Sequence, residues 1–157
     1  MKNQSIKTIL SVIILTLFAS SCGNDDNPST PPNIVPTSIG AGALAGNGEE
    51  EIPEQNIVIT NTADWEVLKN KMNTVNPETD HFTETEIDFS QFRIIAAFDR
   101  VRPMGGHSIA VAAVLDNPNA INVIISRTFP EDIGTAVITQ PYHIVKIPVS
   151  PKPIVFN

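Results

Sequence analysis

Short runs of apolar and β-branched residues alternate with Pro, Gly, Asn and Asp along most of the chain. Runs of this kind, bounded by turn-forming residues, predict β-strands. We expect strands at residues 55–60, 93–98, 108–115, 121–126, 142–147 and 154–156. Most of these runs are apolar on both faces, which is typical of strands that are covered twice. Residues 116–119 (DNPN) predict a hairpin turn between the third and fourth strands, because Pro presets φ and Asn tolerates a left-handed backbone.

One segment has helical spacing, from residue 63 to about residue 73. Trp65, Leu68 and Met72 recur there at i, i+3 and i+7, and Asn61 or Thr62 can cap the N-terminus. We expect this stripe to pack on the sheet, with Trp65 as a core anchor. The pattern therefore predicts an α+β fold: mainly antiparallel β-sheet, sandwich-like, with one packed N-terminal helix.

A glycine-rich stretch, Gly40–Gly48 (GAGALAGNG), precedes three glutamates. Its glycine spacing does not match a dinucleotide-binding loop, and no GK[ST] follows it, so a phosphate-binding loop is excluded. We expect a small-residue loop here.

The N-terminus combines basic and apolar residues. Lys2 and Lys7 precede an apolar run at Ile9–Phe18, and residues 19–21 (ASS) lead directly to Cys22. The run is shorter than the roughly 20 residues that span a bilayer, so it is typical of a secretory signal. Small residues before a cysteine resemble the lipobox of bacterial lipoproteins.

This resemblance implies that residues 1–21 are a lipoprotein signal peptide and that Cys22 is the lipid attachment site. The alternatives are an ordinary cleaved signal with a spare thiol and an uncleaved membrane anchor. Residues 22–36 are rich in Asn, Asp, Ser, Thr and Pro, which predicts a disordered tether. Residues 37–157 then form the folded domain. The acidic start of the tether, Gly23–Asp26, resembles the export tag of some surface lipoproteins and equally fits a solvated linker.

Composition narrows the choice of function. The chain has 157 residues, 17 acidic and 10 basic side chains, a formal net charge of -7 and 1 cysteine. An acidic chain without a basic cluster repels nucleic acids and anionic lipid surfaces. A single cysteine excludes an intramolecular disulfide, a thiolate zinc cluster and a CxxC redox pair.

Two groups of residues suggest chemistry, but neither completes a known pattern. Four carboxylates surround His81, at positions 80, 84, 86 and 88, without the spacing of a calcium loop. Asp99, His107, Ser108 and His143 include the residue types of a serine triad, yet no G-x-S-x-G is present. We therefore expect no catalytic residues, no metal and no cofactor.

Two loop features remain as candidates for partner binding. One joins two apolar strands with a Pro-x-Gly-Gly centre and two arginines, and the other opens a strand with the only tyrosine. The candidate contact residues are Arg102, Pro103, Gly105, Gly106, His107, Pro141, Tyr142 and His143.

These residues belong to a series of motifs that resembles the C-terminal domain of the PrcB family, over roughly residues 34–157. The motifs are Thr60-x-x-x-Asp64-Trp65-x-x-Leu68, Asp88-Phe89-Ser90-x-Phe92-x-Ile94-Ile95-Ala96-Ala97-Phe98, Arg102-Pro103-x-Gly105-Gly106-His107-Ser108-Ile109 and Pro141-Tyr142-His143-Ile144-Val145-x-Ile147-Pro148. Where the family most often has Thr-Gly-Gly-Tyr, this chain has Met104-Gly105-Gly106-His107.

The family takes its name from a lipoprotein subunit that helps to keep a surface protease complex assembled. The resemblance implies a non-catalytic accessory protein that acts by protein contact, with an envelope protein, possibly a protease, as partner. The lipobox implies a cell-envelope location, as an outer membrane lipoprotein on the periplasmic face or the cell surface. Two alternatives stay open, a protease inhibitor and a lipoprotein that binds a glycan or a peptide.

Overall fold

A computed structural model describes residues 31–130 and 135–157. The predicted signal peptide, Cys22 and most of the predicted tether lie outside the described residues. The elements in chain order are β1 (Thr37–Leu44), β2 (Gln55–Ile59), α1 (Thr62–Met72), a 3-10 turn η1 (Glu78–His81), β3 (Phe92–Phe98), β4 (Ser108–Asp116), β5 (Ile121–Thr128), β6 (Gln140–Pro148) and β7 (Ile154–Phe156). All predicted strands are therefore confirmed, with ends that differ by one or two residues.

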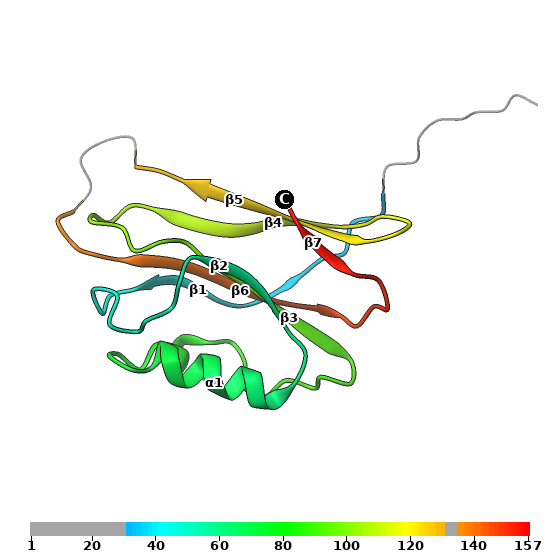
Figure 1. Ribbon diagram of the computed structural model, residues 1–157, viewed down its shortest axis with the longest axis horizontal. Helices are drawn as coiled ribbons and strands as arrows, with labels where there is room; N and C mark the ends of the chain where they lie inside the picture. The colour runs from blue at the N-terminus through cyan, green and yellow to red at the C-terminus, as the bar shows by residue number, and fades with distance from the viewer. Residues whose placement is uncertain (1–30, 131–134) are drawn as a thin grey trace, which may run out of the picture.

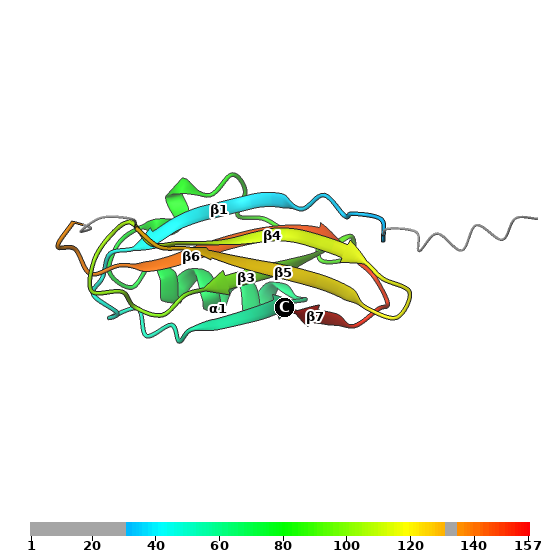
Figure 2. The same ribbon diagram turned by 90° about the horizontal axis from the view of Figure 1, so that it is seen from above.

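The strands form two sheets (Figures 1 and 2). The four-stranded sheet has the order β1-β6-β3-β2, and the three-stranded sheet has the order β4-β5-β7. All pairings are antiparallel except that of β5 with β7, which is parallel. The α+β, mainly antiparallel fold predicted from the sequence is confirmed, as is the hairpin that joins β4 to β5.

Three layers explain the apolar pattern of the central strands. Helix α1 covers one face of the four-stranded sheet, and the three-stranded sheet covers the other (Figure 1). In β3, Ile94, Ala96 and Phe98 belong to the core beneath α1, whereas Ile95 and Ala97 belong to the core between the sheets. Because successive strand residues point to opposite faces, a strand between two cores must be apolar throughout, as β3 is.

Helix α1 begins as its sequence predicts. The side chain of Asn61 accepts a hydrogen bond from the backbone N–H of Asp64 at 2.9 Å and so caps the helix. Trp65, Leu68 and Met72 are all buried against the sheet. The indole N–H of Trp65 donates to the carbonyl of Thr85 at 2.8 Å, which satisfies the one polar atom of this core anchor.

The prediction of a loop at Gly40–Gly48 is wrong for its first half. Residues up to Leu44 form β1, an edge strand that pairs with β6. The small residues are needed because aromatic rings pack over them: a Cβ at Gly40 would lie 2.5 Å from the ring of Phe82. The left-handed backbone expected of a glycine-rich turn begins only at Asn47 and Gly48.

Strand β4 is covered on one face rather than two. Its register with β5 shifts between Val111 and Ala113, which is a β-bulge. Because the extra residue reverses the alternation, Val114 joins Ile109 and Val111 in the core between the sheets. The expected double-sided burial of this strand is therefore wrong.

Candidate protein-contact surface at one end of the sheets

The loop between β3 and β4 lies beside the start of β6, at one end of the molecule (Figure 1). Arg102 and Thr139 exchange backbone hydrogen bonds of 2.7 and 3.0 Å across this junction. The backbone N–H of Asp99 donates to the carbonyl of Pro141 at 2.9 Å. The two features that the sequence offered as partner-binding candidates are thus brought together by the fold.

We call this end of the molecule the tip and define it as residues 99–107, 129–130 and 135–139. It carries four large apolar side chains exposed to solvent, namely Val101, Phe129, Val137 and Ile138. Phe129 is the most open of them, with 57% of its surface exposed. Grouped exposed apolar residues of this kind mark interaction sites on soluble domains.

The tip contains a buried ion pair. The Nε of Arg102 donates to Oδ2 of Asp99 at 2.7 Å and its Nη2 donates to Oδ1 at 3.0 Å, in a bidentate arrangement. Asp99 is 1% exposed and Arg102 is 7% exposed. Arg127 adds a second, longer contact to Asp99 at 3.3 Å.

Phe129 is held in place from two sides. The guanidinium carbon of Arg102 lies 5.3 Å from the ring centroid of Phe129, within the range of a cation–π contact. The ring of His107 approaches Phe129 edge-on, with centroids 5.7 Å apart and planes at 86°. The exposed ring is therefore fixed in orientation by a buried cation and a neighbouring imidazole.

The two glycines of the loop are needed for a close approach. The backbone N–H of Gly105 donates to the carbonyl of Thr135 at 3.0 Å, and a Cβ at Gly105 would lie 2.6 Å from the hydroxyl oxygen of that residue. Gly106 has φ of +86°, in the left-handed region, and a Cβ there would lie 3.0 Å from Pro130. These glycines let the β3–β4 loop lie against the segments that flank the β5–β6 connection.

The eight predicted contact residues divide by accessibility. Pro103 and Gly106 are exposed and His107 is partly exposed, so these three are open to a partner at the tip. Arg102, Gly105, Pro141 and Tyr142 are buried, and His143 is partly buried. The predicted contact residues do not include Asp99 or the four exposed apolar residues. Phe129–Pro130, which follows a polar strand end, was the available signal.

Tyr142 is part of the core beneath α1. It is 2% exposed, and its hydroxyl donates to the carboxylate of Glu78 at 2.6 Å. Burial, helped by the adjacent Glu78 carboxylate, raises the pKa of Tyr142 well above its usual value. Its hydroxyl therefore stays protonated, and the side chain stabilises the packing of η1 against β6.

His143 lies between β1 and β4. Its Nδ1 accepts the backbone N–H of Val111 at 2.9 Å, directly beside the bulge, and its Nε2 lies 3.2 Å from the hydroxyl of Ser38. Burial lowers the pKa of His143 below its usual value. This histidine therefore provides an acceptor for a backbone N–H of strand β4.

The groups that suggested catalysis are occupied elsewhere. Asp99 pairs with Arg102 and Arg127, and His143 binds Val111, so neither orients the other or Ser108. Within residues 31–130 and 135–157, no three His, Cys, Asp or Glu side chains gather as a metal site would require. In the same part of the chain, no helix has the length and apolar character needed to cross a membrane.

Residues 93–148, from β3 to the end of β6, match a family model described as PrcB C-terminal. This match confirms the resemblance to the PrcB family for the part of the chain that contains the tip. The motif at residues 60–68 precedes the matched range. No curated protein and no solved structure matches the chain.

Proposed function

We propose, from the PrcB C-terminal match at residues 93–148, that this chain is a non-catalytic, lipid-anchored accessory subunit that binds an envelope protein through the tip. The partner is an extracytoplasmic protease or another component of an envelope complex. One observation carries the proposal: the ring of Phe129, one of four exposed apolar side chains at the tip, lies against Arg102, which forms a buried bidentate ion pair with Asp99.

The buried pair supports a role in recognition. Two charges removed from water contribute little net stability, and apolar residues of similar volume often do as well. The pair instead fixes the direction of the Arg102 guanidinium, and through it the orientation of the Phe129 ring. A rigid aromatic anchor loses little conformational entropy on binding, and such residues are enriched among the strongest contacts of protein interfaces.

The position of the tip also fits a membrane tether. The carbonyl of Pro32 accepts the backbone N–H of Asp116, at the far end of β4 from the tip. The eight residue steps of β4 from Ser108 to Asp116 span about 26 Å. The chain therefore enters the domain at the end opposite to the tip (Figure 2). A domain held by lipid on Cys22 presents the tip away from its tether.

The lipid anchor itself rests on the sequence. Cys22 follows a short apolar run and small residues, and lipidation there places the chain in the cell envelope as an outer membrane lipoprotein. Two acyl chains give durable membrane attachment, which one chain does not. The domain's net acidity then serves solubility beside the membrane rather than binding to it.

Cross-linked co-purification of the lipidated full chain from its own membranes tests the proposal. We expect an envelope protein to be retained with the wild type. The amount retained should fall at least tenfold with Phe129→Ser. The matched control is Val155→Ser, which removes another exposed apolar side chain, from β7. Retention that is equal for both variants, or no retained protein with the wild type, contradicts the proposal.

Protease inhibition is the second candidate, favoured by the way two neighbouring loops form one apolar edge. The β3–β4 loop and the start of β6 are joined at Arg102 and Thr139, and Phe129 and Ile138 flank this junction. Paired loops at one end of a β-sheet can enter the cleft of a protease. Assays of the full chain against cysteine and serine proteases separate the two candidates, because a stabilising subunit leaves turnover intact and an inhibitor abolishes it.

A further inference from the structure

Strand β2 is the outermost strand of the four-stranded sheet, and among the residues that the structure describes it pairs only with β3. In an antiparallel edge strand, every second residue points its backbone N–H and C=O away from the neighbouring strand. No backbone group in the described part of the chain hydrogen-bonds to this outer edge of β2. The edge can therefore accept a further strand.

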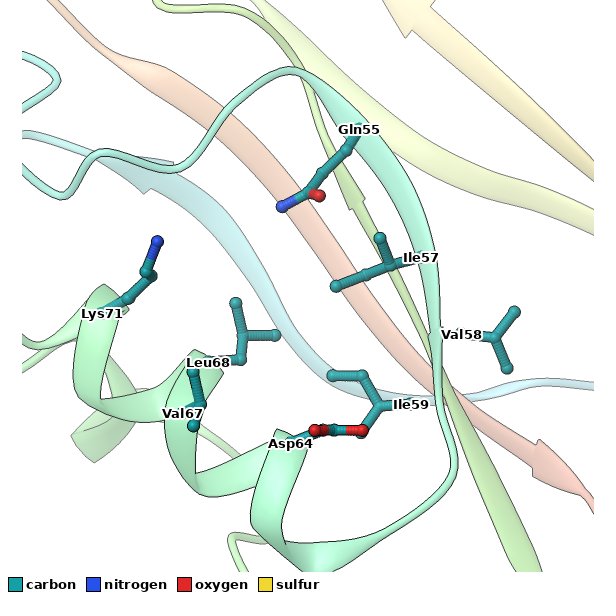
Figure 3. Close-up of a pocket in the computed structure, with 8 residues that line it drawn as sticks. All are labelled: Gln55, Ile57, Val58, Ile59, Asp64, Val67, Leu68 and Lys71. Atoms are coloured by element: carbon teal, nitrogen blue, oxygen red, sulfur yellow. The ribbon is translucent and has the colours of Figure 1, made fainter.

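A groove runs between this free edge and α1 (Figure 3). Its volume is about 330 Å³, at the lower end of the range of ligand pockets. Ile57, Ile59 and Leu68 give it an apolar floor, and Val67, which is 59% exposed, lies at its rim. The groove lies on the face covered by α1, whereas the tip lies at one end of the sheets, so the two sites are separate.

The groove has opposite charges at its two ends. Asp64, Val67 and Lys71 lie on one side of α1 at i, i+3 and i+7 and all line the groove. Figure 3 shows Asp64 beside Ile59 and Lys71 toward Gln55. Lys71 forms no ion pair with a described residue. Seven residues of helix separate the two charges by about 10 Å along the axis.

We propose that this groove binds an extended segment of a partner protein, which adds to β2 as an antiparallel strand. Its central apolar side chain enters the groove over Ile57 and Val67. An antiparallel segment begins near Ile59 and ends near Gln55, so a basic residue two positions before the apolar one approaches Asp64. An acidic residue two positions after it approaches Lys71. These two residues of the segment lie about 13 Å apart, close to the separation of the helical charges.

A peptide strand suits this surface better than a second copy of the chain does. Two copies paired edge to edge through β2 would bring only Gln, Asn, Ile and Val side chains to the groove, and none of these carries a charge to meet Asp64 or Lys71. A single strand with charged residues on either side of an apolar one satisfies the backbone edge and the charges at both ends of the groove, which is the usual mode of β-strand addition.

The test uses fluorescein-labelled peptides and the full lipidated chain in detergent, with binding followed by fluorescence anisotropy. The probe is Thr-Lys-Thr-Leu-Thr-Glu-Thr, and the comparison peptide has Lys and Glu exchanged. We expect the probe to bind about fivefold more tightly than the exchanged peptide, from two solvated ion pairs of modest strength. The double variant Asp64→Lys, Lys71→Asp is expected to reverse this preference.

Backbone pairing is tested with N-methylated forms of the probe, because alternate residues of an added strand donate to β2. Methylation of one alternate set should abolish binding, and methylation of the other set should leave it unchanged. Equal binding of the two forms, or no saturable binding at about 1 mM, overturns the proposal. Phe129→Ser should leave peptide binding unchanged, which separates this site from the tip.

The groove side chains have a matched pair of variants. Val67→Asp places a charge at the groove and should lower the affinity for the probe at least tenfold. Val75→Asp changes an exposed valine outside the groove and should have no effect. Equal binding by both variants overturns the assignment of the groove. The full chain could also form a cross-linked dimer that excludes the probe and that Val67→Asp abolishes. This result would identify a second copy as the occupant of the groove and would overturn the proposal as well.

Discussion

Arg102 contacts Asp99 and Phe129 at the same time, so that one side chain joins a buried carboxylate to an exposed aromatic ring. Its guanidinium makes two hydrogen bonds to Asp99 and lies 5.3 Å from the Phe129 centroid. The guanidinium can do both because it is planar, with donors at its edge and a face free to stack. Arg102 is thus a positioning residue for the tip and not itself a contact residue.

Arg102→Met should destabilise the fold by about 3 kcal/mol, because it leaves Asp99 buried with only the longer contact to Arg127. The double variant Asp99→Asn, Arg102→Met should lose less stability, because it leaves no unpaired charge in the interior. Urea unfolding of the three proteins measures both values. If Arg102→Met lowers the free energy of unfolding by less than about 1 kcal/mol, the Asp99 carboxylate is stabilised by water or by Arg127 instead.

The location of the candidate site could be predicted from the sequence, but the roles of its residues could not. The Pro-x-Gly-Gly turn marked the loop, since such turns are recognisable from local chemistry. The sequence predicts Arg102 to be a contact residue, because an arginine in a loop of an acidic chain is expected to be free to bind a partner. Its partner Asp99 lies only three residues away, yet the pair is surrounded by Gln140 and Pro141 from β6 and by Arg127 from β5. Such tertiary contacts have no local signal.

The elements of the fold also divide into those that could be predicted from the sequence and those that could not. Strands of β-branched residues and helix α1 were predictable, because their patterns reflect a packed face directly. Strand β1 was not, because its sequence is rich in Gly and Ala, which disfavour strands by local propensity. Its small residues are explained by Phe82, which lies more than 35 residues away in the sequence and packs against Gly40. Packing overrode propensity at this strand.

Gly40→Val should therefore destabilise the protein although valine favours strands. The new Cβ would meet the Phe82 ring at 2.5 Å, and overpacking of this kind costs about 1–3 kcal/mol. Ala41→Val is the matched control, because Ala41 is exposed on the same edge strand and has room for the methyl groups. Thermal unfolding of both variants decides the point, and a stable Gly40→Val protein would mean that Phe82 moves aside freely.

Cys22→Ser should release the chain from membranes. Without the thiol no diacylglycerol is attached, and an acidic domain has no electrostatic attraction to anionic lipids. The measurement is the partition of the chain between membrane and soluble fractions, together with the mass of its N-terminal peptide. A variant that stays in the membrane fraction would favour an uncleaved anchor at residues 9–18. A wild-type peptide that carries no lipid would favour an ordinary cleaved signal.

Stability should also depend on His143 as the pH falls. Burial lowers the pKa of His143 in the folded state, whereas the unfolded chain protonates it near the ordinary value of 6.5. The unfolded state therefore binds a proton on this histidine at a pH where the folded state does not. As a result, the free energy of unfolding decreases as the pH falls below about 6.5. The loss continues until the pH reaches the lowered pKa of the folded state. Above 6.5 both states are neutral and the contribution is complete.

His143→Asn isolates this effect, because the Asn carbonyl oxygen can accept the N–H of Val111 without titrating. The other two histidines and all the carboxylates are present in both proteins, so subtraction of the two urea-derived stabilities removes their contribution. We expect the wild type to lose stability relative to the variant between pH 7.5 and 5.5. A difference that is flat over this range, or that rises toward low pH, contradicts the assigned role of neutral His143 as the acceptor beside the bulge.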